Sequence, residues 1–240
     1  MNNKLTTIQL NQGDLLFKYR GLIPVPIIVL TIIYFYLYGK EDISDEYYLL
    51  CIIISFIGLI IRILTIGFAY FKTSGKNTKR QIARKLNTTG VYSLVRNPLY
   101  LANYINWLGI ILLLSDPIIA VISTLIFIII YREIILIEEN FLLEKFNQNY
   151  QSYSTKTPRI IPSFKNWVKP ENEFNLVKSL INIKNGLFAL SIVFYLINSI
   201  ENYKTHGVIF QMNWIFCIML FSIFFYLIIK IYLINSNKKF

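Results

Sequence analysis

The sequence holds few of the side chains that carry out most protein chemistry. It has one histidine, His206, and two cysteines, Cys51 and Cys217. A single histidine excludes a multi-histidine metal site, and two cysteines in separate apolar runs form neither a CxxC pair nor a zinc site. The GxSxG, Walker and GxGxxG motifs are also missing, which excludes the corresponding hydrolases and nucleotide-binding loops. We therefore expect no metal site and interpret both cysteines as packing residues.

Apolar residues, in contrast, are abundant: 55% of the 240 positions are hydrophobic and 16% are aromatic. This exceeds the apolar content of an ordinary globular domain, and a helix of roughly 20 apolar residues crosses the hydrocarbon core of a bilayer. The sequence predicts an all-α, polytopic membrane bundle with about six transmembrane helices. The third and fifth are short, so either could be re-entrant. The expected spans are Leu22–Tyr38, Tyr47–Phe71, Leu99–Leu114, Ile118–Ile137, Leu187–Ile200 and Val208–Ile234.

Charge between these spans predicts the orientation of the chain, because cytoplasmic loops retain Lys and Arg. The loop at residues 40–46 is net acidic and is expected outside. Both termini and the basic segment from Lys72 to Arg96 are then expected on the cytoplasmic side of the inner membrane. The net charge of +11 is explained by attraction to an anionic lipid surface, and no nucleic-acid recognition motif accompanies it. The basic segment contains no acid and holds Lys72, Lys76, Lys79, Arg80, Arg84, Lys85 and Arg96.

The first unusual polar stretch is "GVYSLVRNPLYL", Gly90–Leu101. Pro98 disfavours a helical conformation at Asn97 and suits the first turn of the helix that follows. Helix N-termini attract anions, so this turn could bind an anion or a cofactor carboxylate. The alternative is a simple interfacial turn in which Arg96 and Tyr100 are snorkelling anchors.

The second stretch begins with Arg132, Glu138 and Glu139 directly after an apolar span. The two acids either form a solvated helix face or bind a ligand's hydroxyl, amino or cationic groups at a water-poor site. Arg62 lies inside the expected span Tyr47–Phe71, where a cation is costly. It either draws an anionic head group into the site or snorkels to the membrane surface.

Together these stretches resemble the isoprenylcysteine carboxyl methyltransferase and phospholipid methyltransferase superfamily of integral membrane enzymes. Gly90–Tyr100 is similar to its signature G-x-Y-x-x-x-R-H-P-x-Y, and the resemblance extends over roughly Gly58–Pro162. Thr73–Ile110 further resembles a bacterial branch that includes a lipid A phosphate methyltransferase. The second half of the family signature corresponds to Arg132, Glu138–Glu139, "KFNQNYQSY" and "TPRIIP".

The resemblance implies a methyltransferase that takes S-adenosylmethionine from the cytoplasm and a lipophilic acceptor from the bilayer. It implies a core at residues 1–185, with a cytoplasmic cofactor segment between spans four and five, and two added spans at 186–240. Asn97 replaces the usual histidine, and Asn147 replaces a glycine, which Asn can do where the backbone is left-handed. Residues expected at the catalytic centre are Arg132, Glu139 and Arg62. Residues expected to bind the cofactor are Tyr92, Arg96, Asn97, Pro98, Leu99, Tyr100, Glu138 and Glu139.

The available side chains favour an anionic acceptor. A phosphate or carboxylate needs no base, whereas an ammonium must first lose a proton, and the one histidine is expected outside. We therefore expect transfer to an anionic lipid head group, such as a lipid A phosphate. Phospholipid amine N-methylation, prenylcysteine-type carboxyl methylation and a non-catalytic lipid-binding role remain alternatives. A transporter is disfavoured, because Arg62 is the only charge well inside a span. The sequence does not indicate the oligomeric state.

Overall fold

Every regular element of the described chain is a helix. A computed structural model describes residues 15–20, 24–40, 42–70, 73 and 83–236. Within these ranges there is no strand, and the predicted all-α class is confirmed. A helical turn at residues 15–19 precedes the longer elements. These are α2 (Pro24–Tyr38), α3 (Asp45–Phe68), α4 (Val91–Leu94), α5 (Pro98–Leu113), α6 (Pro117–Lys156), the 3-10 turn η1 (Phe164–Asn166), α7 (Leu176–His206) and α8 (Trp214–Ser236).

The six expected spans all coincide with apolar helices. Four helices, α3, α6, α7 and α8, are long and apolar enough to cross a membrane. The other two, α2 and α5, are apolar but have only 15 and 16 residues. At about 1.5 Å per residue, α5 is about 24 Å long, which is less than the roughly 30 Å of a hydrocarbon core. The third expected span is therefore short, as predicted.

The fifth and sixth spans differ from the prediction. The fifth was expected to be short, but α7 has 31 residues and runs well beyond Leu187–Ile200 at both ends. Polar residues at 182, 184 and 185 interrupt the apolar run in sequence without interrupting the helix. The sixth helix begins at Trp214 and not at Val208. Gly207 ends α7 with a left-handed φ of 72°, and the following residues cross to α8 without helix.

Several predictions fall outside the described residues. These are the start of the first span at Leu22, the end of the second at Phe71, and both chain termini. The basic residues Lys72, Lys76, Lys79 and Arg80 also lie there. The expected domain boundary between residues 185 and 186 falls inside α7.

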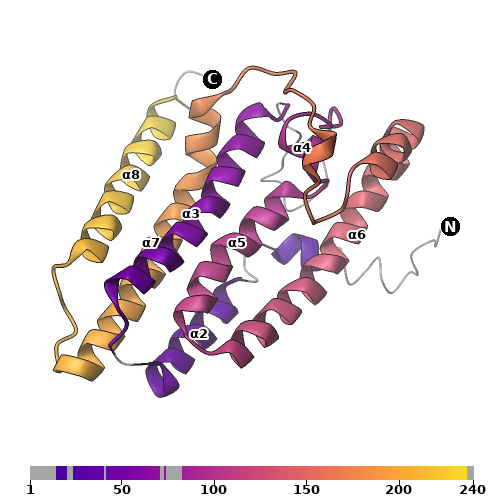
Figure 1. Cartoon of the computed structure of the whole chain (residues 1–240). Helices are drawn as coiled ribbons and strands as arrows, with labels where there is room; N and C mark the ends of the chain where they lie inside the picture. Colours follow the sequence, from indigo (N-terminus) through magenta and orange to yellow (C-terminus); the bar gives the residue numbers. More distant parts are fainter. Residues whose placement is uncertain (1–14, 21–23, 41, 71–72, 74–82, 237–240) are drawn as a thin grey trace.

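The long helices run side by side as a bundle (Figure 1). Helix α3 packs on α5 and α7, α7 also packs on α8 and α2, and α5 packs on α6. The main core is aliphatic and aromatic, with Phe35, Leu59, Ile110 and Ile197 among its most buried members. Of the four long apolar helices, α6 and α8 are the least buried: 17% and 11% of their apolar 18-residue stretches lie inside the bundle. Such unpaired apolar faces are those expected to contact lipid.

Small residues allow α3 and α5 to approach closely. A Cβ at Gly109 would lie 2.2 Å from the Cys51 carbonyl oxygen and from Ser55 Oγ, so α5 touches the α3 backbone here. Ser55 Oγ donates a hydrogen bond of 2.8 Å to the Asn106 carbonyl oxygen across the same contact. Small residues and interhelical hydrogen bonds drive helix association in membranes, where the hydrophobic effect between helices is absent.

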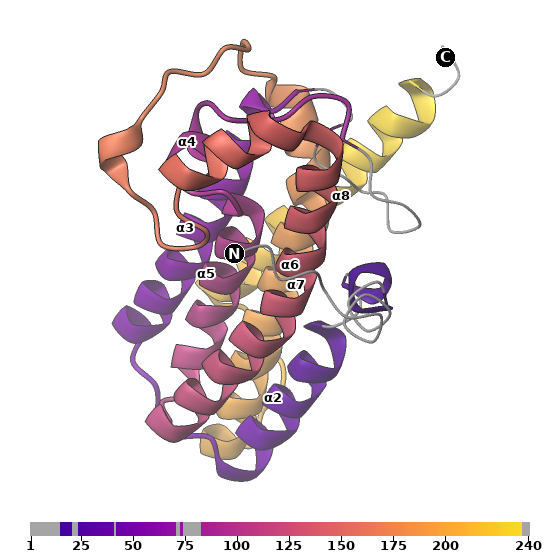
Figure 2. The same ribbon diagram turned by 90° about the vertical axis from the view of Figure 1, so that its right-hand side faces the viewer.

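Helix α6 extends past its expected span, Ile118–Ile137, to Lys156. It bends at Asn147, whose φ of 44° and ψ of −119° lie outside the helical region. The positive φ fits a position where the family has glycine, but the ψ lies outside the left-handed helical region that was expected for Asn147. Beyond the bend, the last turns of α6 cross the end of the bundle (Figure 2). The bend brings residues 148–156 against α4 and the turn after it: the Tyr153 hydroxyl donates to the Tyr92 carbonyl oxygen, and Arg96 Nη1 donates to the Ser154 carbonyl oxygen.

The contact between α3 and α5 predicts that two glycines respond differently to the same substitution. Gly109→Ala should lower the thermal unfolding temperature by several degrees, because overpacking costs ~1–3 kcal/mol. Gly186→Ala is the control, since its Cβ would meet only Leu59 Cδ2 at 3.5 Å, an ordinary contact. It should leave stability unchanged or gain up to about 1 kcal/mol from helix propensity. Equal shifts for both variants in detergent would contradict the close α3–α5 contact.

Candidate active site

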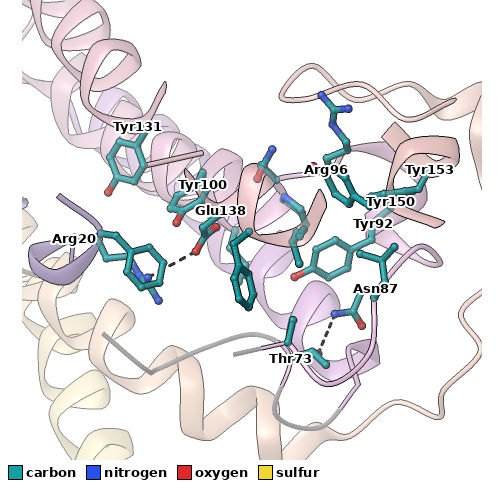
Figure 3. A pocket seen from close by; sticks show the side chains of 18 of the residues that line it. Arg20, Thr73, Asn87, Tyr92, Arg96, Tyr100, Tyr131, Glu138, Tyr150 and Tyr153 are labelled. Carbon is teal, nitrogen blue, oxygen red and sulfur yellow. Dashed lines mark hydrogen bonds and ion pairs between the residues drawn. The ribbon is translucent and has the colours of Figure 1, made fainter. Parts of the chain in front are cut away.

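A cavity of about 270 Å³ lies at the end of the bundle where α4, α5 and the bent part of α6 meet (Figure 3). Its wall comes from segments far apart in sequence, including the helical turn at 15–19 and α3. Both polar stretches of the sequence therefore converge on one cavity. The polar and aromatic residues that line it include Arg20, Arg62, Lys85, Asn87, Tyr92, Arg96, Asn97, Tyr100, Asn103, Tyr131, Glu138, Phe141, Tyr150 and Tyr153.

The turn between α4 and α5 forms one wall and is held by main-chain hydrogen bonds. Gly90 has a φ of 61°, which favours glycine, and its N–H donates to the Val168 carbonyl oxygen at 2.9 Å. The Arg96 N–H donates to the Pro158 carbonyl oxygen at 2.9 Å. Asn97 has a φ of −119° and a ψ of 57°, so the predicted break before Pro98 is confirmed, and Pro98 begins α5. The turn is therefore fastened to the segment that follows α6.

The Glu139 carboxylate joins three segments behind this turn. Its Oε1 accepts from Asn97 Nδ2 at 2.9 Å and lies 3.2 Å from Arg96 Nε. Its Oε2 accepts from Arg159 Nη2 at 2.9 Å and from Arg159 Nε at 3.1 Å. Glu139 is 8% exposed and does not line the cavity. A buried carboxylate needs partners of this kind, and here they come from the turn and from the segment after α6.

Glu138 points into the cavity instead. Adjacent residues on a helix are about 100° apart, so Glu138 and Glu139 face different surroundings. The Glu138 carboxylate lies 3.7 Å from Arg20 Nη1. Figure 3 shows it beside Tyr100 and Tyr131, whose ring centroids are 5.2 Å apart in an edge-on arrangement. Within the described residues, it is the one acidic side chain on the cavity wall.

Three tyrosines form the opposite side of the cavity. The Tyr153 hydroxyl donates to the Tyr92 carbonyl oxygen at 2.7 Å, and its ring meets that of Tyr150 edge-on at 6.0 Å. Burial first, and then the Glu138 carboxylate, raise the pKa of Tyr92 above its usual value, so this phenol remains a donor. The Tyr150 hydroxyl is buried and has no hydrogen-bond partner among the described residues. An unpaired buried hydroxyl costs about 1–3 kcal/mol, so it is available to a ligand.

Arg62 reaches the cavity from α3. Its Nη1 donates to Asn103 Oδ1 on α5 at 3.0 Å. Its side chain lines the cavity, and its role in drawing an anionic head group stays a prediction. Asn103 could have been predicted, because it lies three residues after Tyr100 and shares its helix face.

The structure brings most, but not all, of the expected residues to the cavity. Arg132 is exposed on α6 and lies outside the cavity wall, and Glu139 lies behind that wall. Sequence reasoning missed Arg20 and Tyr131 on the wall, and Arg159 beside Glu139. Arg159 stands between the two prolines of "TPRIIP", but nothing local to it indicates its partner. The expected residues that do line the cavity are Arg62, Tyr92, Arg96, Asn97, Pro98, Leu99, Tyr100 and Glu138.

The remaining titratable candidates lie elsewhere. His206 ends α7 at the end of the bundle opposite the cavity, as Figure 1 shows from the course of that helix. Glu201 is buried near the same end and accepts from the Tyr48 hydroxyl at 2.7 Å. In the part of the chain that the structure describes, no group of three or more His, Cys, Asp or Glu could hold a metal ion.

Comparison with known proteins finds similarity over part of the chain. Residues 47–149 match the family model described as phospholipid methyltransferase. The nickel-cobalt-cadmium resistance protein NccN of Alcaligenes xylosoxydans xylosoxydans is 32% identical over 78 residues. That alignment covers 32% of this chain and 36% of the relative, so it extends over about a third of each. No solved structure matches the chain.

The different surroundings of the paired glutamates predict different consequences of the same substitution. Glu139→Gln should lower the unfolding temperature clearly, because it removes the shared counter-charge of Arg96 and Arg159; breaking a buried pair costs about 3–5 kcal/mol. Glu138→Gln should change it little, because this carboxylate has a single looser ion pair at 3.7 Å. Thermal unfolding in detergent measures both. A larger loss for Glu138→Gln than for Glu139→Gln would contradict the assignment.

Proposed function

We propose that the chain is a membrane methyltransferase that uses S-adenosylmethionine. The match of residues 47–149 to the phospholipid methyltransferase family model supports this proposal. The acceptor of this methyltransferase is a lipophilic molecule with an anionic head group, a phosphate or a carboxylate, such as a lipid A phosphate. The observation that carries this proposal is the single cavity formed by the two separate motifs. That cavity combines aromatic rings, one carboxylate and several cations at the end of a bundle of apolar helices.

The cavity suits S-adenosylmethionine in its chemistry. Its volume of about 270 Å³ is near the lower end of the roughly 300–1,000 Å³ typical of ligand pockets. The Glu138 carboxylate can accept from an ammonium group or from ribose hydroxyls, and the free hydroxyl of Tyr150 can bond to a further polar atom. The rings of Tyr92, Tyr100 and Phe141 can stack on an adenine or face a cation. The residues present therefore fit the cofactor.

When bound, S-adenosylmethionine supplies a methyl group on a positively charged sulfur. The protein's own contribution is to orient the two reactants and to exclude water. The tyrosine rings and the buried turn provide a water-poor enclosure, and Glu139 holds Arg96 and Asn97 in place behind it. No proton-abstracting residue is needed if the acceptor is already an anion.

The charge of the cavity wall supports an anionic acceptor. Besides the Glu138 carboxylate, the cavity wall holds four cationic side chains. Of these, Arg96 is paired with Glu139, and Lys85 is paired with Glu171. Arg20 pairs with Glu138 itself. Arg62 is hydrogen-bonded to the neutral amide of Asn103, so the wall carries an excess of positive charge. An anionic head group would balance this excess, and planar guanidinium groups bind phosphates and carboxylates well.

The alternatives receive less support. Amine methylation requires a base, and Glu138 is held by Arg20 while His206 lies at the other end of the bundle. A non-catalytic role was suggested by Asn97 in place of the usual histidine. However, Asn97 Nδ2 donates to Glu139 and to the Arg159 carbonyl oxygen, so the residue at this position takes part in the hydrogen bonds that hold the wall.

Cofactor binding tests the proposal directly. Calorimetry on detergent-purified protein should show binding of S-adenosylmethionine and S-adenosylhomocysteine. Glu138→Gln should weaken it about 10-fold or more, because a charged hydrogen bond contributes about 1.5–3 kcal/mol. Arg132→Gln is the matched control on the same helix and should bind as the unaltered protein does. Absence of binding to the unaltered protein would leave a lipid-binding membrane protein without this chemistry.

Arg62 should affect turnover rather than cofactor affinity. Arg62→Leu should reduce transfer of labelled methyl to phosphate-bearing lipids by roughly tenfold or more, about 1.4 kcal/mol in transition-state stabilisation. Calorimetric affinity for S-adenosylhomocysteine should stay the same, because the cofactor contacts assigned above do not include Arg62. Unchanged turnover would show that Arg62 takes no part in holding the acceptor.

A further inference from the structure

The segment between α6 and α7 exposes large apolar side chains. Ile161, Phe164 and Trp167 are 81%, 79% and 54% exposed. They are not on a transmembrane helix, since this stretch contains only the short turn η1. In Figure 2 the segment leaves the bundle on the side of α3 and passes beside α4. Exposed apolar groups concentrated in one loop mark a contact surface.

The end of α3 indicates the depth of this segment in the membrane. Exposed apolar residues run along α3 from Leu49 to Leu64 and define its lipid-facing side. The helix has 24 residues, about 36 Å, which slightly exceeds a hydrocarbon core of roughly 30 Å. Its last turn therefore lies at the membrane boundary. Asn172 Nδ2 donates to the Phe68 carbonyl oxygen at 2.9 Å, which ties the segment to that turn.

The charge of the segment identifies what it contacts. Arg159, Lys165 and Lys169 are exposed, and no acid occurs between Thr157 and Pro170. Aromatic and aliphatic residues alternating with Lys and Arg are typical of peptides that lie in the head-group region of anionic bilayers. A membrane surface thus suits both the apolar tips and the basic residues.

The same segment holds the wall of the cavity. The Ser163 N–H donates to the Leu94 carbonyl oxygen at 2.9 Å, and the Val168 N–H donates to Ser93 Oγ at 2.9 Å. Together with the bonds from Gly90 and Arg96 described above, four hydrogen bonds join the segment to residues 90–96, and a fifth joins Asn97 Nδ2 to the Arg159 carbonyl oxygen. A change in the position or order of the segment therefore also affects the cavity wall.

We infer that residues 159–169 form an interfacial anchor that inserts Ile161, Phe164 and Trp167 among the head groups of an anionic bilayer. Binding of this anchor to the membrane holds the 90–96 turn in its cavity-forming conformation. The inference concerns membrane contact and local order, and it does not depend on which group the cavity methylates.

Fluorescence of Trp167 in nanodiscs tests the contact. The fluorescence of Trp167 is obtained by subtracting the signal of the Trp167→Phe variant from that of the unaltered protein. The phenylalanine in this variant retains an apolar ring. In discs of phosphatidylglycerol, this signal should be quenched by lipids brominated near the head group, more than by lipids brominated near the chain end. Equal quenching of Trp167 by aqueous iodide in discs and in detergent, with no lipid quenching, would overturn the inference. Protection from both quenchers would also overturn it, because a second protein surface would then cover the residue.

Hydrogen exchange tests the link to the cavity wall. Amides of residues 90–96 should exchange several-fold more slowly in phosphatidylglycerol discs than in phosphatidylcholine discs. Phe164→Ser with Trp167→Ser should abolish this difference, while α8 amides stay unaffected and show that the bundle is folded. Lys165→Gln with Lys169→Gln is the charge-only control and should reduce the lipid dependence in part. Identical exchange in both lipids for the unaltered protein would refute the coupling, whatever the outcome of cofactor binding.

Discussion

The buried carboxylate of Glu139 is the interaction on which the site depends. It forms ion pairs with two arginines and accepts a hydrogen bond from the Asn97 amide, so the turn before α5, the long helix α6 and the segment after it meet at one group. Each partner compensates part of the cost of removing this charge from water, and the group as a whole fixes their relative positions. Glu139 thereby connects the cavity wall in front of it to α6 and to the segment after α6.

The neighbouring Glu138 has the opposite role. It faces the cavity, where its charge is only partly compensated by Arg20, and it lies among tyrosine rings that exclude water. The two adjacent acids thus have different surroundings: Glu139 joins segments behind the cavity wall, and Glu138 faces the cavity, where we propose that it contacts the cofactor. Arg62 adds positive charge to the cavity wall, which supports the anionic acceptor that we propose.

Much of this arrangement could be predicted from local patterns. The apolar runs indicated the helices, and Pro98 marked a helix start that the structure shows at that position. Asn147 was noted only as a replacement of glycine, and the bend of α6 there was not predicted. Boundaries were predicted poorly where polar residues lie inside a helix, as in α7. Those polar residues do not break a helix whose other faces are packed against neighbours, so hydropathy alone underestimates its length. Arg20 and Arg159 were not predicted, because their partners are distant in the chain.

The sequence by itself determined the membrane class, the approximate helices and the two motifs that meet in the site, because these follow from composition and from spacing along the chain. Only the tertiary structure decided which glutamate faces the cavity, that Arg132 stays outside it, and that residues 159–169 fasten its wall. Rotation of α6 about its axis sets the first two, and it is fixed by packing against other helices. The third depends on hydrogen bonds between segments about 60 to 80 residues apart, which no local pattern encodes.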